Sequence, residues 1–174
     1  LAVLSTAEIA ALTTAQVAAL TSDQVGALTT GQVVALTTTA LGQFGTAHAQ
    51  ALTSTQVATL SSAQVAALTT TALGAIETAD ISALTTAALR GLGTGQAAAL
   101  GSDQVAALTT GQLVSLSTAQ VAALASDAIG ALGTAKLAAL TTAQVAALTT
   151  AQVAALTVTQ VPALTTAQVQ ALTT

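Results

Sequence analysis

The chain repeats one eight-residue pattern from end to end without an insertion or a deletion. An apolar residue recurs at every eighth position from Leu4 to Leu172, 22 times in one register, and it is Leu except at Phe44 and Ile76. An unbroken register is typical of stacked repeats, because one slipped unit would misplace every later side chain. The pattern predicts a single uninterrupted array over residues 1–174, with about 22 octads.

Each position of the octad has its own residue preference. With positions named a to h from Ser5, the consensus is Thr-Thr-Ala-Gln-Val-Ala-Ala-Leu, as in Thr141–Leu148. Position e is always apolar, so e and h are predicted to form the core. Position g is nearly always Ala, which indicates a close contact. Position b is Ser or Thr in 21 of 22 octads, whereas d and f carry polar or varied residues and are predicted to face solvent.

A repeat of eight favours short helices over one long helix. A continuous helix turns once per 3.6 residues, so an eight-residue pattern would drift by about 80° per repeat and its apolar stripe would find no partner. The segment Thr-x-x-Gln at positions a to d matches a capping box, and Ala, Leu and Gln favour helix. The hydroxyl at b is an alternative N-cap. Glycines directly after position h suit a left-handed residue that ends the previous helix; they are Gly45, Gly93, Gly101 and Gly133.

The predicted fold class is therefore an all-α repeat solenoid with one short capped helix per octad. Similar segments recur 80 residues apart, at Thr21–Leu36 and Gly101–Leu116, and 32 residues apart, at Thr37–Gly42 and Thr69–Gly74. Both offsets are multiples of 16, which is compatible with a coil of two octads. The alternative is a β-solenoid, since Thr and Val favour strands. The spacing of b, e and h by three residues does not match the alternation of a strand.

Composition excludes two classes of partner. Only 5% of the residues are charged, the net charge is −4, and the two basic residues, Arg90 and Lys136, are far apart in sequence. Nucleic-acid binding needs clustered Lys and Arg, so none is expected. A membrane-spanning helix needs about 20 consecutive, mostly apolar residues, and Ser, Thr and Gln interrupt every apolar run. The hydrophobic fraction of 53% predicts an ordered chain.

No residue pattern indicates catalysis, a cofactor or a metal. His48 occupies position d, predicted to face solvent, without a Cys or Asp nearby in sequence. Glu77 and Asp80 are three residues apart, but nothing marks them as a catalytic pair. Acidic residues at position c suit a helix N-terminus; they are Asp23, Asp103 and Asp127. We predict that the chain is not an enzyme and has no catalytic, cofactor-binding or metal-binding residue.

The ends of the array suggest the partner. Solenoids normally end in polar capping repeats, whereas the first residues, Leu1–Leu4, are apolar and the last, Gln168–Thr174, follow the consensus. The expectation is that the array is a segment of a longer one, or that chains associate with themselves, end to end or laterally.

The octads resemble those of very large proteobacterial surface proteins. The strings Leu140–Leu148 and Glu77–Leu84 carry this resemblance, which covers the whole chain. It implies secretion and a stalk, fibre or adhesive role, with contact to a surface or cell envelope. A shorter string, Leu28–Leu36, is similar to the opening of the first helix of TAL-effector repeats, which supports a capped helix. The 34-residue unit and base-reading pair of that family are missing, so DNA binding is not implied.

Three functions fit these observations. The first is a structural role as an extracellular filament, fibre or adhesin stalk built by repeat stacking. The second is binding of ice or another surface by the regular row of Thr and Ser hydroxyls. The third, a passive scaffold that presents a groove to a peptide, is weakened by the shortage of charged and aromatic residues.

Overall fold

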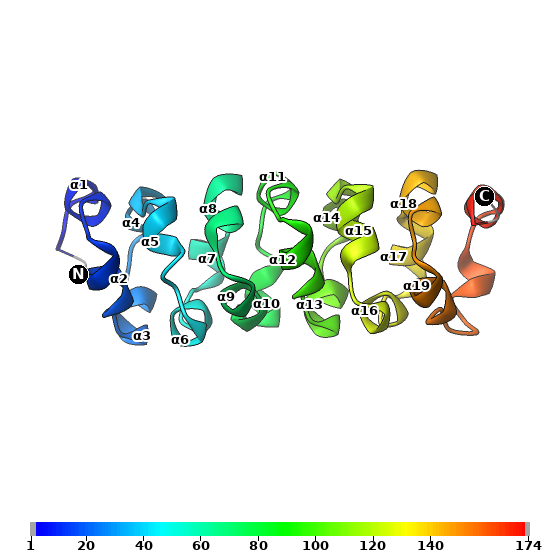
Figure 1. Ribbon diagram of the computed structural model, residues 1–174, viewed down its shortest axis with the longest axis horizontal. Coiled ribbons are helices and arrows are strands. Elements are labelled where there is room, and N and C mark those ends of the chain that lie inside the picture. The colour runs from blue at the N-terminus through cyan, green and yellow to red at the C-terminus, as the bar shows by residue number, and fades with distance from the viewer. Residues whose placement is uncertain (1–2, 173–174) are drawn as a thin grey trace. The chain divides into compact units, whose positions relative to one another are not determined.

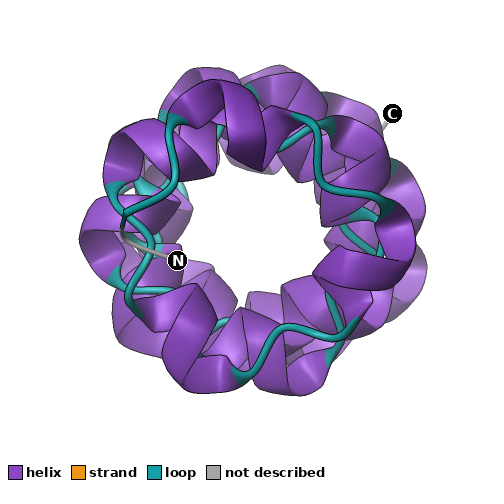
Figure 2. Cartoon of the chain, turned by 90° about the vertical axis from the view of Figure 1, so that its left-hand side faces the viewer, coloured by secondary structure: helices purple, strands orange, loops and turns teal. Residues whose placement is uncertain are grey.

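Almost every octad folds into one short α-helix followed by a turn. The structure, a computed structural model, describes residues 3–172, and these residues contain no strand (Figures 1 and 2). The all-α repeat solenoid is thus confirmed, and the β-solenoid alternative is wrong. No helix among these residues is long and apolar enough to span a membrane.

The chain divides into two compact units, Leu1–Leu92 and Gly93–Thr174, at a boundary between two octads. The helices of the first unit are α1 (Thr6–Ala10), α2 (Thr14–Ala18), α3 (Ser22–Gly26), α4 (Thr30–Ala35), α5 (Thr38–Leu41), α6 (Thr46–Gln50), α7 (Ser54–Val57), α8 (Ser62–Ala67), α9 (Thr70–Ala75), α10 (Thr78–Ile81) and α11 (Thr86–Arg90).

The helices of the second unit are α12 (Thr94–Ala98), α13 (Ser102–Ala107), α14 (Thr110–Ser115), α15 (Thr118–Ala123), α16 (Ser126–Gly130), α17 (Thr134–Ala139), α18 (Thr142–Ala146), α19 (Thr150–Ala154), the 3₁₀ helix η1 (Val161–Ala163) and α20 (Thr166–Ala171). Pro162 lies in η1, the one octad of the unit whose helix is not α-helical in residues 93–172. A proline removes a backbone donor, which explains the tighter local turn.

The first residue of the octad, position a, begins each helix. In α18 the Thr141 hydroxyl accepts the Gln144 N–H at 3.1 Å, while the Gln144 side-chain oxygen accepts the Thr141 N–H at 3.0 Å. This is the predicted capping box, and it places the preceding Leu at N′ and the Val at N4, the two positions of a hydrophobic staple. The alternative cap at position b is therefore wrong. Helices this short do not persist alone in water, so packing must hold them.

The glycines at position a do not end the preceding helix in a left-handed conformation. No glycine among residues 3–172 has a positive φ, and Gly93, for example, is an extended N-cap with φ −70° and ψ 160°. The prediction of a left-handed C-cap at Gly45, Gly93, Gly101 and Gly133 was wrong. The helices end instead on a right-handed residue at g or on an extended Leu at h, and neither conformation needs glycine.

Helices pack against those three octads away. We number the octads so that octad 1 is Ser5–Leu12. In the first unit α1 contacts α4, α2 contacts α5, and the series continues to α8 with α11; in the second unit it runs from α12 with α15 to α17 with η1. Side chains also bond to residues 28 to 31 positions earlier, in the octad four back. One turn of the coil therefore holds between three and four octads, and the two-octad coil was wrong.

The core consists of positions e and h, as predicted. Val33, Val65, Val105 and Val145 at position e are fully buried, and the Leu residues at h from Leu28 to Leu140 are at most 5% exposed. Position f is exposed or half-buried throughout residues 3–172, which confirms that prediction. Position d, which was also predicted to face solvent, is buried from Gln32 onward wherever it carries Gln.

Position g tolerates only small groups where the turns approach most closely. A Cβ on Gly91 would lie 2.8 Å from the Cα of Ser62, three octads earlier. Neither backbone can yield easily. We expect Gly91→Ala to lower the free energy of unfolding by about 1–3 kcal/mol, as overpacked substitutions do.

The matched control is Gly111→Ala. A Cβ at Gly111 meets nothing within 4 Å, and the residue lies inside α14, so we expect the change to be neutral or stabilising by up to about 1 kcal/mol. Urea denaturation of the two variants measures the difference. Equal stabilities would contradict the close approach at Gly91.

Candidate functional site: the glutamine ladder between turns

The buried glutamine at position d binds its own octad and the octad four back at the same time. The Gln144 side-chain oxygen accepts the Thr141 N–H, and its Nε2 donates to the carbonyls of Leu113, Val114 and Leu116 at 3.0, 3.3 and 2.8 Å. These carbonyls are at positions e, f and h of octad 14, at the end of α14, where a helix leaves its carbonyls without intrahelical donors. One side chain therefore joins a helix start to the helix end above it.

The same geometry repeats along both units, and we call the set of these side chains the glutamine ladder. The distance from Nε2 to the carbonyl at position h is 2.7–3.0 Å in each of its described rungs. Those rungs are Gln56, Gln64, Gln144, Gln152, Gln160 and Gln168. No buried side-chain nitrogen or oxygen in residues 3–172 lacks a hydrogen-bond partner.

Sequence reasoning missed the ladder because it read Gln as a solvated residue. Glutamine is usually exposed, and its acceptors lie 28 to 31 residues away, where no local pattern marks them. The available signal was the contrast between d and f. Both positions looked polar, but f varies freely among Gly, Val, Arg and Pro, whereas d returns repeatedly to Gln. A residue held constant at one of two supposedly exposed positions indicates a specific contact.

Octads without Gln at d compensate in the core. Alanine occupies d at Ala40, Ala72, Ala88 and Ala128, and each of these residues is buried. The next residue, at e, is then the larger Leu or Ile instead of the usual Val. Because protein interiors are close-packed, the added methylene replaces part of the volume that Gln would fill.

His48 takes the glutamine position with a ring. It was predicted to face solvent but is only 9% exposed. Its Nδ1 accepts the Gly45 N–H at 3.4 Å, and its Nε2 lies 2.6 Å from the Leu20 carbonyl, which is the position-h carbonyl four octads back. An accepting Nδ1 leaves the proton on Nε2, which donates. The ring also packs on Phe44, with centroids 5.2 Å apart. The interpretation of His48 as a variant of the repeat fits this arrangement.

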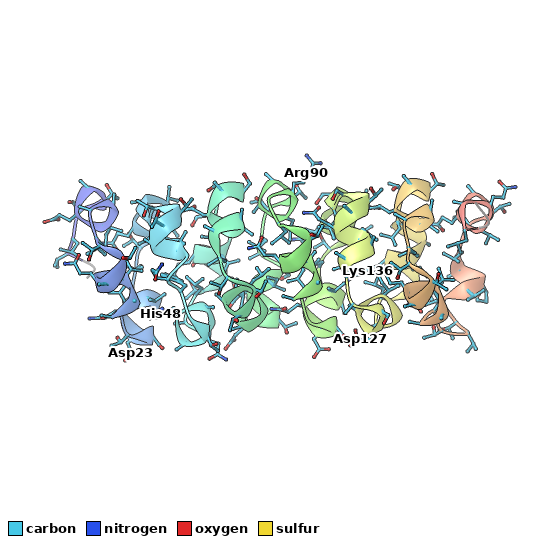
Figure 3. The ribbon with its side chains drawn as sticks, viewed as in Figure 1. Asp23, His48, Arg90, Asp127 and Lys136 are labelled. Atoms are coloured by element: carbon cyan, nitrogen blue, oxygen red, sulfur yellow. The ribbon has the colours of Figure 1, made fainter. Side chains whose placement is uncertain are left out.

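Two charged residues also occupy position d. Lys136 donates through Nζ to the Ala106 carbonyl 30 residues earlier, so it keeps the bond to the previous turn. Asp80 is buried and accepts the Ser54 hydroxyl from α7. In Figure 3, Lys136 lies within the outline of the ribbon, whereas Arg90, at position f, projects outward.

The acidic residues are scattered. Asp23, Asp103 and Asp127 are exposed in the first turns of α3, α13 and α16, and Asp127 accepts the Ser102 hydroxyl at 2.9 Å. Glu77 is the N-cap of α10.

Glu8 caps α1 in the manner of Gln. Hydrogen bonds from the Ser5 N–H, and then from its hydroxyl, hold the pKa of Glu8 below its ordinary value of 4.5. Within residues 3–172, no three His, Cys, Asp or Glu residues form a group that could hold a metal ion.

The outer surface carries hydroxyls. Positions a and b are exposed in nearly every described octad. The hydroxyl at a caps its helix, whereas the one at b, which is more constant in the sequence, has a structural partner in only a few octads. Ser22 donates to the Ala47 carbonyl at 3.2 Å, and Ser54 and Ser102 bind the aspartates named above.

Short capped helices stacked through a ladder of side-chain amides define an all-α repeat protein. A family model described as the ALTTAQ repeat matches residues 1–30, 73–110, 105–134, 129–158 and 138–174, which together cover most of the chain. The chain belongs to the ALTTAQ repeat family. Neither the curated proteins nor the solved structures contain a match to it.

The ladder predicts that a buried rung matters more than an exposed glutamine at the same octad position. Gln144→Leu keeps the volume but leaves the Thr141 N–H and three carbonyls without their partner, so we expect a loss of roughly 2–4 kcal/mol in the free energy of unfolding. Gln16→Leu is the matched control. Gln16 is exposed and makes only the capping box, so its replacement should cost less than about 1 kcal/mol.

A second variant separates the two roles of the rung. Gln144→Glu keeps the capping oxygen but points a carboxylate at carbonyl oxygens. Burial then raises the pKa of the new carboxyl in the folded state. Because the folded pKa exceeds the unfolded one, the variant is most stable in acid and loses stability as the pH rises. Urea titrations at several pH values measure this, and a pH-independent stability difference would contradict the donor role.

Proposed function

We propose that this chain is a structural element of an extracellular filament, fibre or adhesin stalk, built by stacking of its repeats. The observation that supports it most is the glutamine ladder, because the same bond joins each turn to the next irrespective of position along the array. Such a design lengthens without a new kind of contact, and its stability grows with nearest-neighbour terms. No cluster of chemically active side chains competes with this role in residues 3–172.

The composition suits exposure outside the cell. Cys, Met, Trp and Tyr are absent, which leaves few side chains to oxidise. Arg90 and Lys136 are the only targets for trypsin-like proteases. The resemblance of the octads to those of proteobacterial surface proteins supports the same placement, at the cell surface or beyond it, with contact to other copies, a surface or the cell envelope.

The exposed hydroxyls favour a second candidate, which is binding of ice or another surface. Position b keeps its hydroxyl in 21 of 22 octads although capping uses position a. A constant group without a constant structural partner is what a contact surface requires. The first candidate is preferred, because adjacent Thr-Thr pairs differ from the alternating Thr-x-Thr rows of flat ice-binding sheets.

Small-angle X-ray scattering and negative-stain electron microscopy of the purified chain test the proposed role. A stalk or filament element should give stiff, elongated particles, and a variant that duplicates Thr141–Leu156 in register should be longer by a constant increment. A variant that inserts only the four residues of half an octad is the control, since it breaks the register. Compact particles for the unmodified chain would overturn the stalk role, and thermal hysteresis of the same sample would favour the second candidate.

A further inference from the structure

The two ends of the array expose opposite halves of the same contact. In the interior, the side chain at d is covered by the octads before it, and the side chain at e is covered by the octads after it. Accordingly, Gln16 and Gln24 in octads 2 and 3 are exposed, although Val17 and Val25 beside them are fully buried. At the other end the pattern is reversed. Gln160 and Gln168 are buried.

The valines next to those last glutamines are uncovered. Val161 is 52% exposed and Val169 is 46% exposed, whereas the equivalent Val145 is fully buried. Their octads also keep unused acceptors. Leu132 and Leu140 at position h each accept a Gln Nε2, but no described residue donates to the carbonyls of Leu156 or Leu164.

The first turn therefore presents amide donors, and the last turn presents carbonyl acceptors beside an apolar patch. We call them the donor face, Gln16 and Gln24, and the acceptor face, Val161, Leu164 and Val169. Every described rung of the glutamine ladder is a contact between these two kinds of face. The surface that fits the acceptor face is therefore a turn of this same repeat that carries Gln at position d.

We propose that the donor face of one copy of this chain docks on the acceptor face of a second copy. The contact is head to tail, so each copy keeps one face open for the next. Whether the series closes into a ring or continues as a fibre depends on the rotation between copies. This inference deepens the proposed structural role by assigning the partner and the atoms that bind it.

The ladder also sets the register of the contact. Gln32, in octad 4, bonds to the Leu4 carbonyl at 2.8 Å, so the first residues of the chain act as the octad that would follow the last complete one. Counting on from there places Gln24 of the second copy over the last complete octad and Gln16 over the octad that contains Leu164. Glu8 of the second copy then lies over the Leu156 carbonyl.

Glu8 opposes this contact. Its carboxylate makes the same capping box as Gln but offers no N–H to the Leu156 carbonyl. A pair of oxygens without a hydrogen between them repels, and the charge must also lose water. We therefore expect Glu8→Gln to strengthen association roughly fivefold, the effect of one added hydrogen bond.

Sedimentation velocity over a concentration series tests the proposal. The unmodified chain should associate reversibly, and the double variant Gln16→Glu, Gln24→Glu should weaken the association by roughly tenfold or more. Glu8 shows that Glu serves in the capping box, so this variant keeps its fold, and circular dichroism checks that. Gln50→Glu, an exposed position-f residue of α6, is the charge-matched control and should associate normally.

Mixing experiments decide the polarity of the contact. The double variant Val161→Glu, Val169→Glu removes the acceptor face and should be monomeric alone. Mixed with the Gln16→Glu, Gln24→Glu variant, it should form a one-to-one dimer, because each variant keeps one intact and complementary face.

Three outcomes would overturn the proposal. They are a monomeric unmodified chain at every concentration, association that survives loss of the donor face, and a mixture that stays monomeric. A monomeric but elongated chain would leave the stalk role intact, whereas compact particles would overturn that role independently.

Discussion

The bond from the position-d amide to the carbonyls of an earlier turn is the constraint on which the structure depends. A helix of four to six residues begins with unpaired N–H groups and ends with unpaired carbonyls, and one octad cannot satisfy both. Gln144 solves the problem at both ends, since its oxygen caps α18 and its nitrogen caps the end of α14. The chain must therefore coil so that each helix start meets a helix end four octads back. The valine and leucine core fills the space that this geometry leaves.

The same constraint explains the strict register and the tolerated exceptions. An inserted residue would separate every later amide from its carbonyls, whereas a substitution can be absorbed locally. His48 and Lys136 reach the earlier turn with different chemistry, and the octads with Ala at position d enlarge the neighbouring core residue instead. The array is therefore rigid in length per repeat but permissive in residue type, which suits a role that depends on spacing more than on any single side chain.

Much of the local structure was predictable from the octad itself. The capping box, the apolar positions e and h, and the small position g follow from residue preferences within eight residues, and the structure confirms them. The number of octads per turn was not predictable, because it depends on contacts such as that of Gln56 with Leu28, 28 residues apart. Two further errors share one cause. Gln was assigned to solvent and Gly93 to a left-handed cap because both were judged by their usual local behaviour, whereas the next turn decides their environment.

The spacing of the turns can be tested directly, because the chain has no cysteine of its own. A Cβ built at Gly31 lies 3.9 Å from the Cγ2 of Thr6, three octads earlier, which is close enough for a disulfide. The measurement is the fraction of intramolecular disulfide formed under mild oxidation in two double variants: Thr6→Cys with Gly31→Cys, and Thr6→Cys with Asp23→Cys, where the partners are two octads apart. A coil of between three and four octads predicts rapid closure of the 6–31 pair and little closure of the 6–23 pair. Preferential closure of the 6–23 pair would contradict the coil and, with it, the ladder.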